Sequence, residues 1–352
     1  MGLDDLIYQN TEWLRGTGPQ SNIVISSRIR LARNVEKLPF SHWADEQKEK
    51  EILALVQPAV QSSNCLKNVL FLKLSDLSRL DKQFLLERHL ISREHAEGKN
   101  SKAVVISEKE VISIMINEED HLRIQVLRSG FDLTEAWRLI SKIDEEIQAT
   151  LNLAFSSRWG YLTACPTNVG TGMRASVMLH LPALVMTKQI SRVLQALDKL
   201  SVAARGLYGE GTEALGDFFQ FSNQITLGHT EEDLIDNVER VVKQLITHET
   251  EARQALINQN KKRISDRIWR SYGTLKNAHI ISSSETINLL SMVRLGVDTG
   301  IIKNIDQAKI NKLFIFSQPA HLQKVENKIL TPMQRDIKRA DLLRKELGGK
   351  DV

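Results

Sequence analysis

Four short segments of the chain combine charged side chains, glycines and a cysteine in patterns that core packing does not explain. The first, residues 26–30, reads Ser-Ser-Arg-Ile-Arg, so in a strand Arg28 and Arg30 point to the same face. Two guanidinium groups on one face repel each other unless an anion lies between them, and their planar forks fit phosphate oxygens. The segment therefore predicts a phosphate clamp, although a solvated edge strand with surface arginines would show the same pattern.

The second segment places three consecutive carboxylates, Glu118, Glu119 and Asp120, directly after an apolar run. Adjacent carboxylates repel one another, which favours a bound cation or a raised pKa on one of them. With His121 and Arg123 close by, the segment predicts a general base and an acid that organises magnesium. A charged hairpin turn is the plainer alternative.

The third and fourth segments contain glycines next to reactive side chains. Residues 165–176 begin with Cys165 and carry two glycines that leave backbone N–H groups free to face an anion. No Gly-Lys-Ser/Thr follows, so this is not a P-loop, and by itself Cys165 is typical of a small buried side chain. Residues 205–211 surround Glu210 with glycines, which fits either a flexible turn or a carboxylate on a loop that closes over substrate.

These segments need a frame of strands and helices to bring them together. Apolar and alternating runs predict strands over residues 22–34, 69–74, 103–107, 111–117, 122–127, 175–181, 202–208 and 218–227. Helical spacing of apolar residues predicts helices over residues 1–18, 45–61, 132–155, 186–200, 231–270, 284–296, 306–316 and 331–347. The expected fold class is α/β (α+β), an antiparallel β-sheet flanked by helices over residues 1–255, followed by an all-α region over residues 256–352.

Charge divides the 352-residue chain in the same way. Lys and Arg number 47 against 43 Asp and Glu, a formal charge of +4, which gives no reason to expect nucleic acid binding. Residues 260–352 hold 18 of those bases and 9 of the acids, so they carry +9 and the preceding residues carry −5. Two distant cysteines, no signal segment and no long apolar stretch predict a cytoplasmic protein without a membrane span.

Together the four segments resemble the phosphagen (guanidino) kinase family, over roughly residues 20–255. Within that family the chain looks most similar to protein-arginine kinases, because the helical C-terminal region carries Arg335-Asp336-Ile337-Lys338-Arg339-Ala340. Few residues precede the first motif, so the N-terminal domain that encloses small guanidines is missing. The resemblance therefore implies a site open to an arginine side chain on a protein.

The resemblance also implies a role for each motif residue. Glu119 is expected to be the catalytic base, Glu118 to organise magnesium through water, Glu210 to align the guanidinium and Cys165 to lie beside it as a thiolate. The expected nucleotide-binding residues are Ser26, Ser27, Arg28, Ile29, Arg30, His89, Arg123, Arg174, Ala175, Ser176, Val177, Met178, Arg205, Gly206, Leu207, Tyr208, Gly209 and Glu210. Tyr208 stands where small-substrate enzymes carry an arginine, so one phosphate contact must be made differently.

The implied activity is ATP-dependent phosphorylation of arginine side chains in proteins, with ATP and Mg²⁺ as cofactors and no metal bound by the protein itself. It would mark proteins for Clp-type degradation and control a stress response, with an activator protein, a Clp ATPase and a heat-shock repressor as partners and a homodimer as the unit. Residues 335–340 would form an allosteric phosphoarginine pocket, although the pattern alone favours a solvated amphipathic helix. The alternatives are a kinase of a small free guanidino compound and a non-catalytic phosphoarginine-binding adaptor.

Overall fold

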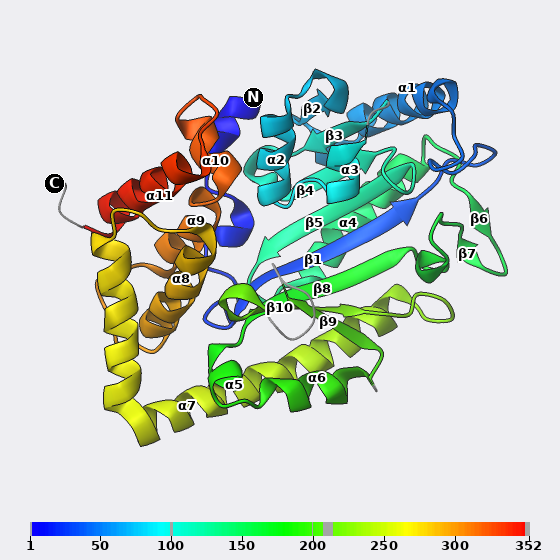
Figure 1. Ribbon diagram of the computed structural model, residues 1–352. Coiled ribbons are helices and arrows are strands. Elements are labelled where there is room, and N and C mark those ends of the chain that lie inside the picture. The colour runs from blue at the N-terminus through cyan, green and yellow to red at the C-terminus, as the bar shows by residue number, and fades with distance from the viewer. Residues whose placement is uncertain (1, 99–100, 199, 207–213, 349–352) are drawn as a thin grey trace.

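A twisted antiparallel sheet forms the centre of the computed structural model, which describes residues 2–98, 101–198, 200–206 and 214–348 (Figure 1). Its eight strands lie in the order β2-β3-β4-β5-β1-β8-β10-β9, and all neighbours pair antiparallel. The strand bounds are β1 Val24–Arg33, β2 Leu70–Lys73, β3 Ala103–Ile106, β4 Ile112–Ile116, β5 Leu122–Ser129, β8 Met173–His180, β9 Val202–Gly206 and β10 Phe218–Asn223. A separate hairpin pairs β6 (Phe155–Ser156) with β7 (Gly160–Tyr161).

The two faces of the sheet differ in polarity because successive side chains of a strand point to opposite sides. On one face Ile29, Ile124 and Val177 are fully buried in the main hydrophobic core. Helix α4 (Leu133–Gln148) packs on β1 and β5 there, and the first half of α7 (Glu231–Asn277) packs on β8 and β10. The other face carries Arg28 and Arg30 of β1, Arg123 of β5 and Arg174 of β8, so core formation on one side leaves these charged side chains on the open side.

The C-terminal helices form a second hydrophobic core at one end of the sheet (Figure 1). Helix α7 bends at Asn260, whose φ of −137° and ψ of 33° are not helical. The helices that follow are α8 Ser283–Asp298, α9 Gln307–Phe316, α10 Pro319–Val325 and α11 Pro332–Leu347. Their apolar side chains pack against Trp13, Leu127 and Phe218, so this region contacts the sheet directly.

Most predicted strands are confirmed, but several helices differ from their predicted extents. Residues 1–18 form two 3₁₀ turns, η1 (Leu3–Ile7) and η2 (Glu12–Leu14), because their apolar side chains are buried by tertiary contacts rather than along one helix face. The predicted helix 132–155 ends at Gln148, and the strand predicted over 218–227 ends at Asn223. The predicted helix 186–200 is instead two helices, α5 (Pro182–Met186) and α6 (Ile190–Asp198), separated where Lys188 adopts a φ of 56°.

Three short helices were not predicted, α2 (Arg79–Glu87), α3 (Arg93–Glu97) and α10 (Pro319–Val325), whereas α1 spans Glu46–Ser62, close to its predicted extent. Helices α2 and α3 both begin with a serine cap, since the hydroxyls of Ser78 and Ser92 accept backbone N–H groups three residues later. No helix among the described residues is both long enough and apolar enough to cross a bilayer. The predicted boundary at 255/256 falls inside α7 and stays a prediction.

A buried ion pair joins α7 to the end of the sheet. Glu249 accepts hydrogen bonds from the backbone N–H groups of Ala183 and Leu184 and pairs with Arg253 at 2.7 Å, while Arg253 also donates to the carbonyl of His180. Glu249→Ala leaves a buried cation without its main partner, so we expect the free energy of unfolding to fall by about 3–5 kcal/mol.

The matched control is Glu239→Ala, which removes a surface carboxylate paired with Lys243 on the same helix. We expect that change to cost less than about 1 kcal/mol, because solvent screens exposed pairs. Denaturant unfolding of both variants measures the difference. If both variants lost the same free energy of unfolding, the buried Glu249–Arg253 pair would not be an important link between α7 and the sheet.

Candidate active site

The open face of the sheet gathers arginines from adjacent strands. Strand β1 lies between β5 and β8, and the register sets Arg30 directly opposite Arg174 and Arg28 opposite Ser176. Arg123 on β5 pairs with Ala32, on the same face as Arg30. Cross-strand neighbours lie close enough for their side chains to interact, so like charges placed this way repel.

Among the described residues, Arg28, Arg30 and Arg174 lack the carboxylate partner that usually accompanies a buried arginine, whereas Arg123 pairs with Glu118. Burial, followed by the charges of Arg123 and Arg174, lowers the pKa of Arg28 to about 10. Burial and neighbouring arginines also lower the pKa of Arg30, and the Nε atoms of Arg30 and Arg174 have no hydrogen-bond partner among the described residues. Arg33, on the opposite face of the same strand, is paired with Asp144 at 2.8 Å. The open face is therefore built to accept an anion.

The acidic segment forms the turn between β4 and β5, next to the arginines. Asn117, in the left-handed region at φ 60°, holds this turn by donating to the carbonyls of Glu49 and Ser101. Glu118 pairs with Arg123 at 2.7 Å and accepts a hydrogen bond of 2.6 Å from the Ser92 hydroxyl.

The same turn holds its two glutamates in different protonation environments. Burial alone would raise the pKa of Glu118, but the charge of Arg123 together with hydrogen bonds from Ser92 and the Glu119 amide lowers it to about 2. Glu119 is exposed, and partial desolvation followed by the charges of Asp120 and Glu118 raises its pKa. Two neighbouring carboxylates with opposite shifts are typical of divided roles, one a fixed charge and the other a proton acceptor.

The remaining members of the acidic segment hold the site together. Asp120 is buried and accepts hydrogen bonds of 2.7 Å from the Asn34 side chain and the Ala164 amide. The His121 ring contacts the Val35 amide at 2.9 Å. Asp120 therefore connects the turn to the loop that precedes Cys165, and His121 connects it to the segment that follows β1.

A cavity of about 140 Å³ brings the predicted reactive groups together. It is lined by Arg30, Glu119, Arg123, Cys165 and Arg174, with backbone and smaller side chains around them. Cys165 is half-buried, and its Sγ lies 3.0 Å from the hydroxyl of Thr167. A base, a thiol and three guanidinium groups share this space, an arrangement suited to proton removal next to a phosphoryl group.

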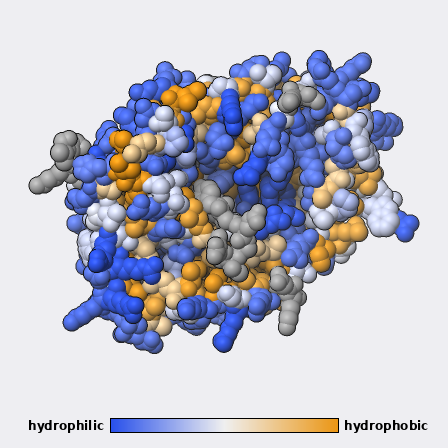
Figure 2. Space-filling view, viewed as in Figure 1, coloured by the Kyte–Doolittle hydropathy of each residue, from blue (hydrophilic) through white to orange (hydrophobic). Residues whose placement is uncertain are grey.

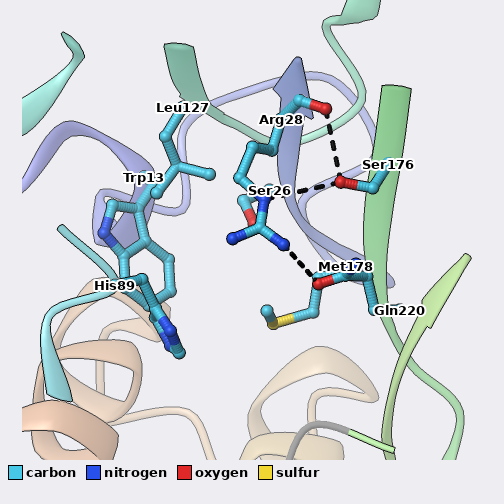
Figure 3. Close-up of a pocket in the computed structure, with 8 residues that line it drawn as sticks. All are labelled: Trp13, Ser26, Arg28, His89, Leu127, Ser176, Met178 and Gln220. Atoms are coloured by element: carbon cyan, nitrogen blue, oxygen red, sulfur yellow. Dashed lines mark hydrogen bonds between the residues drawn. The ribbon is translucent and has the colours of Figure 1, made fainter. Parts of the chain in front are cut away.

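A second, smaller cavity of about 10 Å³ lies further along the arginine row (Figure 3). Figure 3 shows Arg28 between Trp13 and His89 on one side and Ser176 and Gln220 on the other. Its guanidinium donates to Gln220 at 2.6 Å, and burial followed by the charge of Arg28 lowers the pKa of His89 to about 4. The His89 ring is therefore neutral near pH 7, and its Nε2 has no partner among the described residues.

Trp13 and Gln220 were missed by the sequence reasoning. The Trp13 indole meets the His89 ring edge-on at 5.4 Å between centroids, and its buried Nε1 has no hydrogen-bond partner among the described residues. The sequence offered one signal for each: Trp13 is an isolated tryptophan in a polar N-terminal segment, and Gln220 is a glutamine among the phenylalanines of a strand. Neither pattern predicts which cavity the side chain lines.

Comparison with known proteins decides the family. Residues 51–252 match the ATP:guanido phosphotransferase C-terminal catalytic domain, and residues 261–351 match the protein-arginine kinase McsB C-terminal domain. The protein-arginine kinase of Halothermothrix orenii is 47% identical over 349 residues, which cover 99% of this chain and 100% of that protein. The protein-arginine kinase of Moorella thermoacetica is 50% identical over 346 residues, or 97% and 99% of the two chains. The chain belongs to the protein-arginine kinases of the ATP:guanido phosphotransferase family.

Solved structures agree on the fold of this protein-arginine kinase. A lombricine kinase superposes with a TM-score of 0.58 at 24% identity, over 69% of this chain and 71% of that chain. A duplicated taurocyamine kinase from Schistosoma mansoni superposes with a TM-score of 0.60 at 21% identity, over 86% of this chain and 52% of that chain. The predicted guanidino kinase fold is confirmed.

Other residues predicted to bind nucleotide in this kinase lie elsewhere on the sheet. The side chains of Ile29, Ala175 and Val177 are buried in the core beneath the site, so only their backbone groups could reach a ligand. The Ser27 hydroxyl is buried and donates to the carbonyl of Gly130. Two further residues predicted to bind nucleotide, Ser26 and Met178, line the second cavity. Arg205 and Gly206, also predicted, are the last two residues of strand β9. Leu207, Tyr208, Gly209 and Glu210 lie outside the described residues.

The C-terminal motif of the kinase lies on α11. Arg339 is buried and donates to the carbonyls of Ser317 at 2.7 Å and Ile281 at 2.9 Å, and it pairs with Asp336. Arg335 donates to the Leu330 carbonyl at 3.1 Å. In the rest of the motif, the side chain of Ile337 is exposed and that of Ala340 is buried. Lys338 forms a salt bridge with Glu326. In this conformation Arg339 holds helices together, and the phosphoarginine pocket stays a prediction.

The crowding of cations predicts opposite effects on stability and on binding. Arg30→Met removes one positive charge from the cluster, so we expect the free energy of unfolding of the nucleotide-free protein to rise by roughly 1 kcal/mol. The same change removes hydrogen bonds to charged oxygens, so we expect the Kd for ADP to rise by about tenfold or more. Calorimetric unfolding and titration calorimetry measure the two effects.

Arg33→Met is the matched control, because Arg33 lies on the same strand as Arg30 but points to the opposite face of the sheet. It leaves Asp144 buried without its cation, so we expect a loss of about 3–5 kcal/mol. If Arg30→Met destabilised the protein as Arg33→Met does, the open-face cluster would be a structural network rather than an anion site.

Proposed function

We propose that this protein-arginine kinase transfers the γ-phosphoryl group of ATP to an arginine side chain at the 140 Å³ cavity, with Glu119 as the base. The observation that carries the proposal is the shared cavity of Glu119, whose pKa is raised, and Arg30, Arg123 and Arg174. The second cavity described above contains Arg28 and His89 but no carboxylate.

The reaction requires a base because a guanidinium holds its proton strongly, with a pKa above about 12. As a nitrogen of the substrate guanidinium attacks the γ-phosphorus, an N–P bond forms, the bond to the bridging oxygen of ADP breaks, and Glu119 takes a proton from the guanidinium. The arginines stabilise the charge on the transferring group and on ADP. Such transfer depends mainly on positioning and electrostatic stabilisation, which the sheet supplies through side chains fixed by register.

The nucleotide would lie along the arginine row. Arg28, His89, Ser176 and Met178 would surround its base and ribose near the second cavity, with Trp13 as a further wall. The arginines of the first cavity and Arg205 would contact the phosphates. Nucleotide contacts by Leu207, Tyr208, Gly209 and Glu210 stay a prediction, as does the alignment of the substrate guanidinium by Glu210.

Magnesium would enter with the nucleotide phosphates rather than bind to the protein alone. Among the described residues no group of three or more His, Cys, Asp or Glu side chains could hold a metal ion. The donors fit this mode, since Mg²⁺ usually keeps several waters and binds through one or two carboxylates plus substrate phosphates. Glu118, held ionised beside Arg123, and Glu119 would contact its waters, and the ion would offset charge on the phosphates.

Cys165 would help to position the guanidinium. Its Sγ lines the cavity together with Glu119 and Arg174, so a thiolate there would face the positively charged substrate group. The hydrogen bond with Thr167 fixes the sulfur at the cavity wall.

The wider role that we propose follows from the family. Phosphoarginine would mark proteins for Clp-type degradation and control a stress response in the cytoplasm. An activator protein, a Clp ATPase and a heat-shock repressor would be partners of a homodimer. Residues 335–340 would bind phosphoarginine and regulate the catalytic region.

Glu119→Gln tests the assignment of the base. We expect the rate of phosphorylation of an unfolded protein substrate to fall by about 10²–10⁴-fold, the usual contribution of general base catalysis. Mass spectrometry of acid-labile phosphate on arginine measures the product, and titration calorimetry with ADP should give an unchanged Kd. Loss of ADP binding would contradict the assignment, and phosphate found only on Ser, Thr or Tyr would contradict the function.

The raised pKa of Glu119 predicts the acid limb of the pH profile. A base must be deprotonated, so kcat/KM should fall as pH is lowered through a pKa above the usual value of about 4.3 for glutamate. Glu94, an exposed carboxylate on α3, is one of the charges that raise this pKa. Glu94→Gln should therefore move the inflection to lower pH without abolishing activity. An inflection that stays in place, or rises, would exclude Glu119 as the titrating group.

A further inference from the structure

The loop over residues 165–172 places Cys165 at the wall of the 140 Å³ cavity, and Thr167 and Gly172 line the same cavity. Figure 2 shows hydrophilic residues around a hollow on the open face of the sheet, the face on which the arginines of this cavity lie. The loop contains the 3₁₀ turn Pro166–Asn168 and an isolated bridge between Gly170 and Tyr161. Such short elements form few hydrogen bonds of their own, so contacts from elsewhere must fix the position of the sulfur.

Thr226, on the connection between β10 and α7, makes contacts of this kind. Its hydroxyl donates to the carbonyl of Val169 at 2.7 Å and also lies 3.0 Å from the carbonyl oxygen of Thr167. Its own carbonyl accepts a hydrogen bond of 3.2 Å from the Thr171 amide. Thr226 is buried, so water does not compete for these groups. One residue thus holds three positions of the Cys165 loop.

A glycine lets the two backbones approach each other. Gly170 has a φ of 112°, in the left-handed region, and a Cβ at this position would collide with the carbonyl oxygen of Thr226. Any other residue would therefore push the loop away from Thr226.

The connection that carries Thr226 is itself fixed to strand β8. The Asn223 side chain accepts the backbone N–H of Ala175 at 2.8 Å and donates to the carbonyl of Met173 at 3.1 Å. These two residues lie on either side of Arg174, which lines the cavity. The position of Thr226 is therefore set relative to the arginines of the site.

Two contacts lead from Thr226 to the sulfur. The Thr226 hydroxyl lies at the carbonyl of Thr167, and the Thr167 hydroxyl lies 3.0 Å from the Cys165 Sγ. On the other side of the cysteine, Asp120 accepts the Ala164 amide at 2.7 Å. The loop is thus held on both sides of Cys165, by the acidic turn and by Thr226.

We propose that Thr226 is a positioning residue for the kinase reaction, whose hydroxyl holds the loop so that the Cys165 sulfur lies beside the substrate guanidinium. This inference rests on the proposed function, which gives Cys165 that place. A small displacement of a group that orients the reactants lowers the rate of the chemical step strongly. Thr226 lines neither of the two cavities, so its loss should lower turnover and leave nucleotide affinity unchanged.

Two substitutions separate the hydroxyl from the shape of the side chain. Thr226→Val removes the hydroxyl, and we expect kcat with an unfolded protein substrate to fall by about tenfold while KM for ATP stays unchanged. Thr226→Ser keeps the hydroxyl, so kcat should stay within about twofold of the unaltered kinase. Thr286→Val is the matched control, since Thr286 is also buried and its hydroxyl donates to the Ser282 carbonyl at the start of α8. It should keep the full kcat.

A double-mutant cycle separates action through Cys165 from a general loss of stability. In the Cys165→Ser background, Thr226→Val should lower the remaining kcat by less than about twofold, because residues that act through one another have non-additive effects. An equal loss in both backgrounds would overturn the inference, as would an unchanged kcat in Thr226→Val alone.

Alkylation of Cys165 by iodoacetamide is a measurement that needs no kinase activity. Peptide mass spectrometry gives its rate relative to that of Cys65, the other cysteine of the chain. Thr226→Val should raise this ratio about threefold or more, because a loosened loop exposes the sulfur, and Thr226→Ser should leave it unchanged. An unchanged ratio in the valine variant would overturn the inference. If the unaltered kinase phosphorylated no arginine, the proposed function would fail instead, and the ratio would still show whether Thr226 holds the loop.

Discussion

Repulsion among guanidinium groups on one face of the sheet is the constraint around which this kinase is organised. Arg30 and Arg174 face each other across the β1–β8 pair, with Arg28 and Arg123 nearby, and carboxylates neutralise only part of this charge. Like charges at that spacing destabilise a free protein, and the arrangement is tolerated because the opposite face buries a continuous core of β-branched and aliphatic residues. An anion as charged as ATP relieves the repulsion, so stability and nucleotide affinity are opposed at these positions.

The acidic turn shows how neighbouring groups of one type acquire different tasks. Glu118 is surrounded by donors, which keep it ionised, whereas Glu119 faces the cavity beside other carboxylates, which raise its pKa. Asp120 then holds the loops on either side. The sequence of three acids looks uniform, but hydrogen bonds and desolvation lower the pKa of Glu118, raise that of Glu119 and make Asp120 an acceptor of hydrogen bonds from Asn34 and Ala164.

The C-terminal helices form hydrogen bonds with the segments that carry Trp13 and His89 of the second cavity. The side chain of Asn311 on α9 donates to the carbonyl of Leu14, next to Trp13, and Trp13 lies beside His89. Glu87 on α2, two positions before His89, accepts the backbone N–H groups of Ala320 and His321. The C-terminal helices are therefore in contact with segments that carry two residues of the second cavity, Trp13 and His89.

The sequence by itself determined most of the strands, the helical C-terminal region and five residues that line the 140 Å³ cavity, namely Arg30, Glu119, Arg123, Cys165 and Arg174. These follow from alternation, from helical spacing and from short motifs that act locally. It did not predict the 3₁₀ turns at the N-terminus or the division of α5 from α6, because burial by distant elements decides those conformations. Only the tertiary structure placed Arg30 opposite Arg174 and Trp13 against His89. Each of these depends on register or on contacts between residues far apart in the chain, which no local pattern encodes.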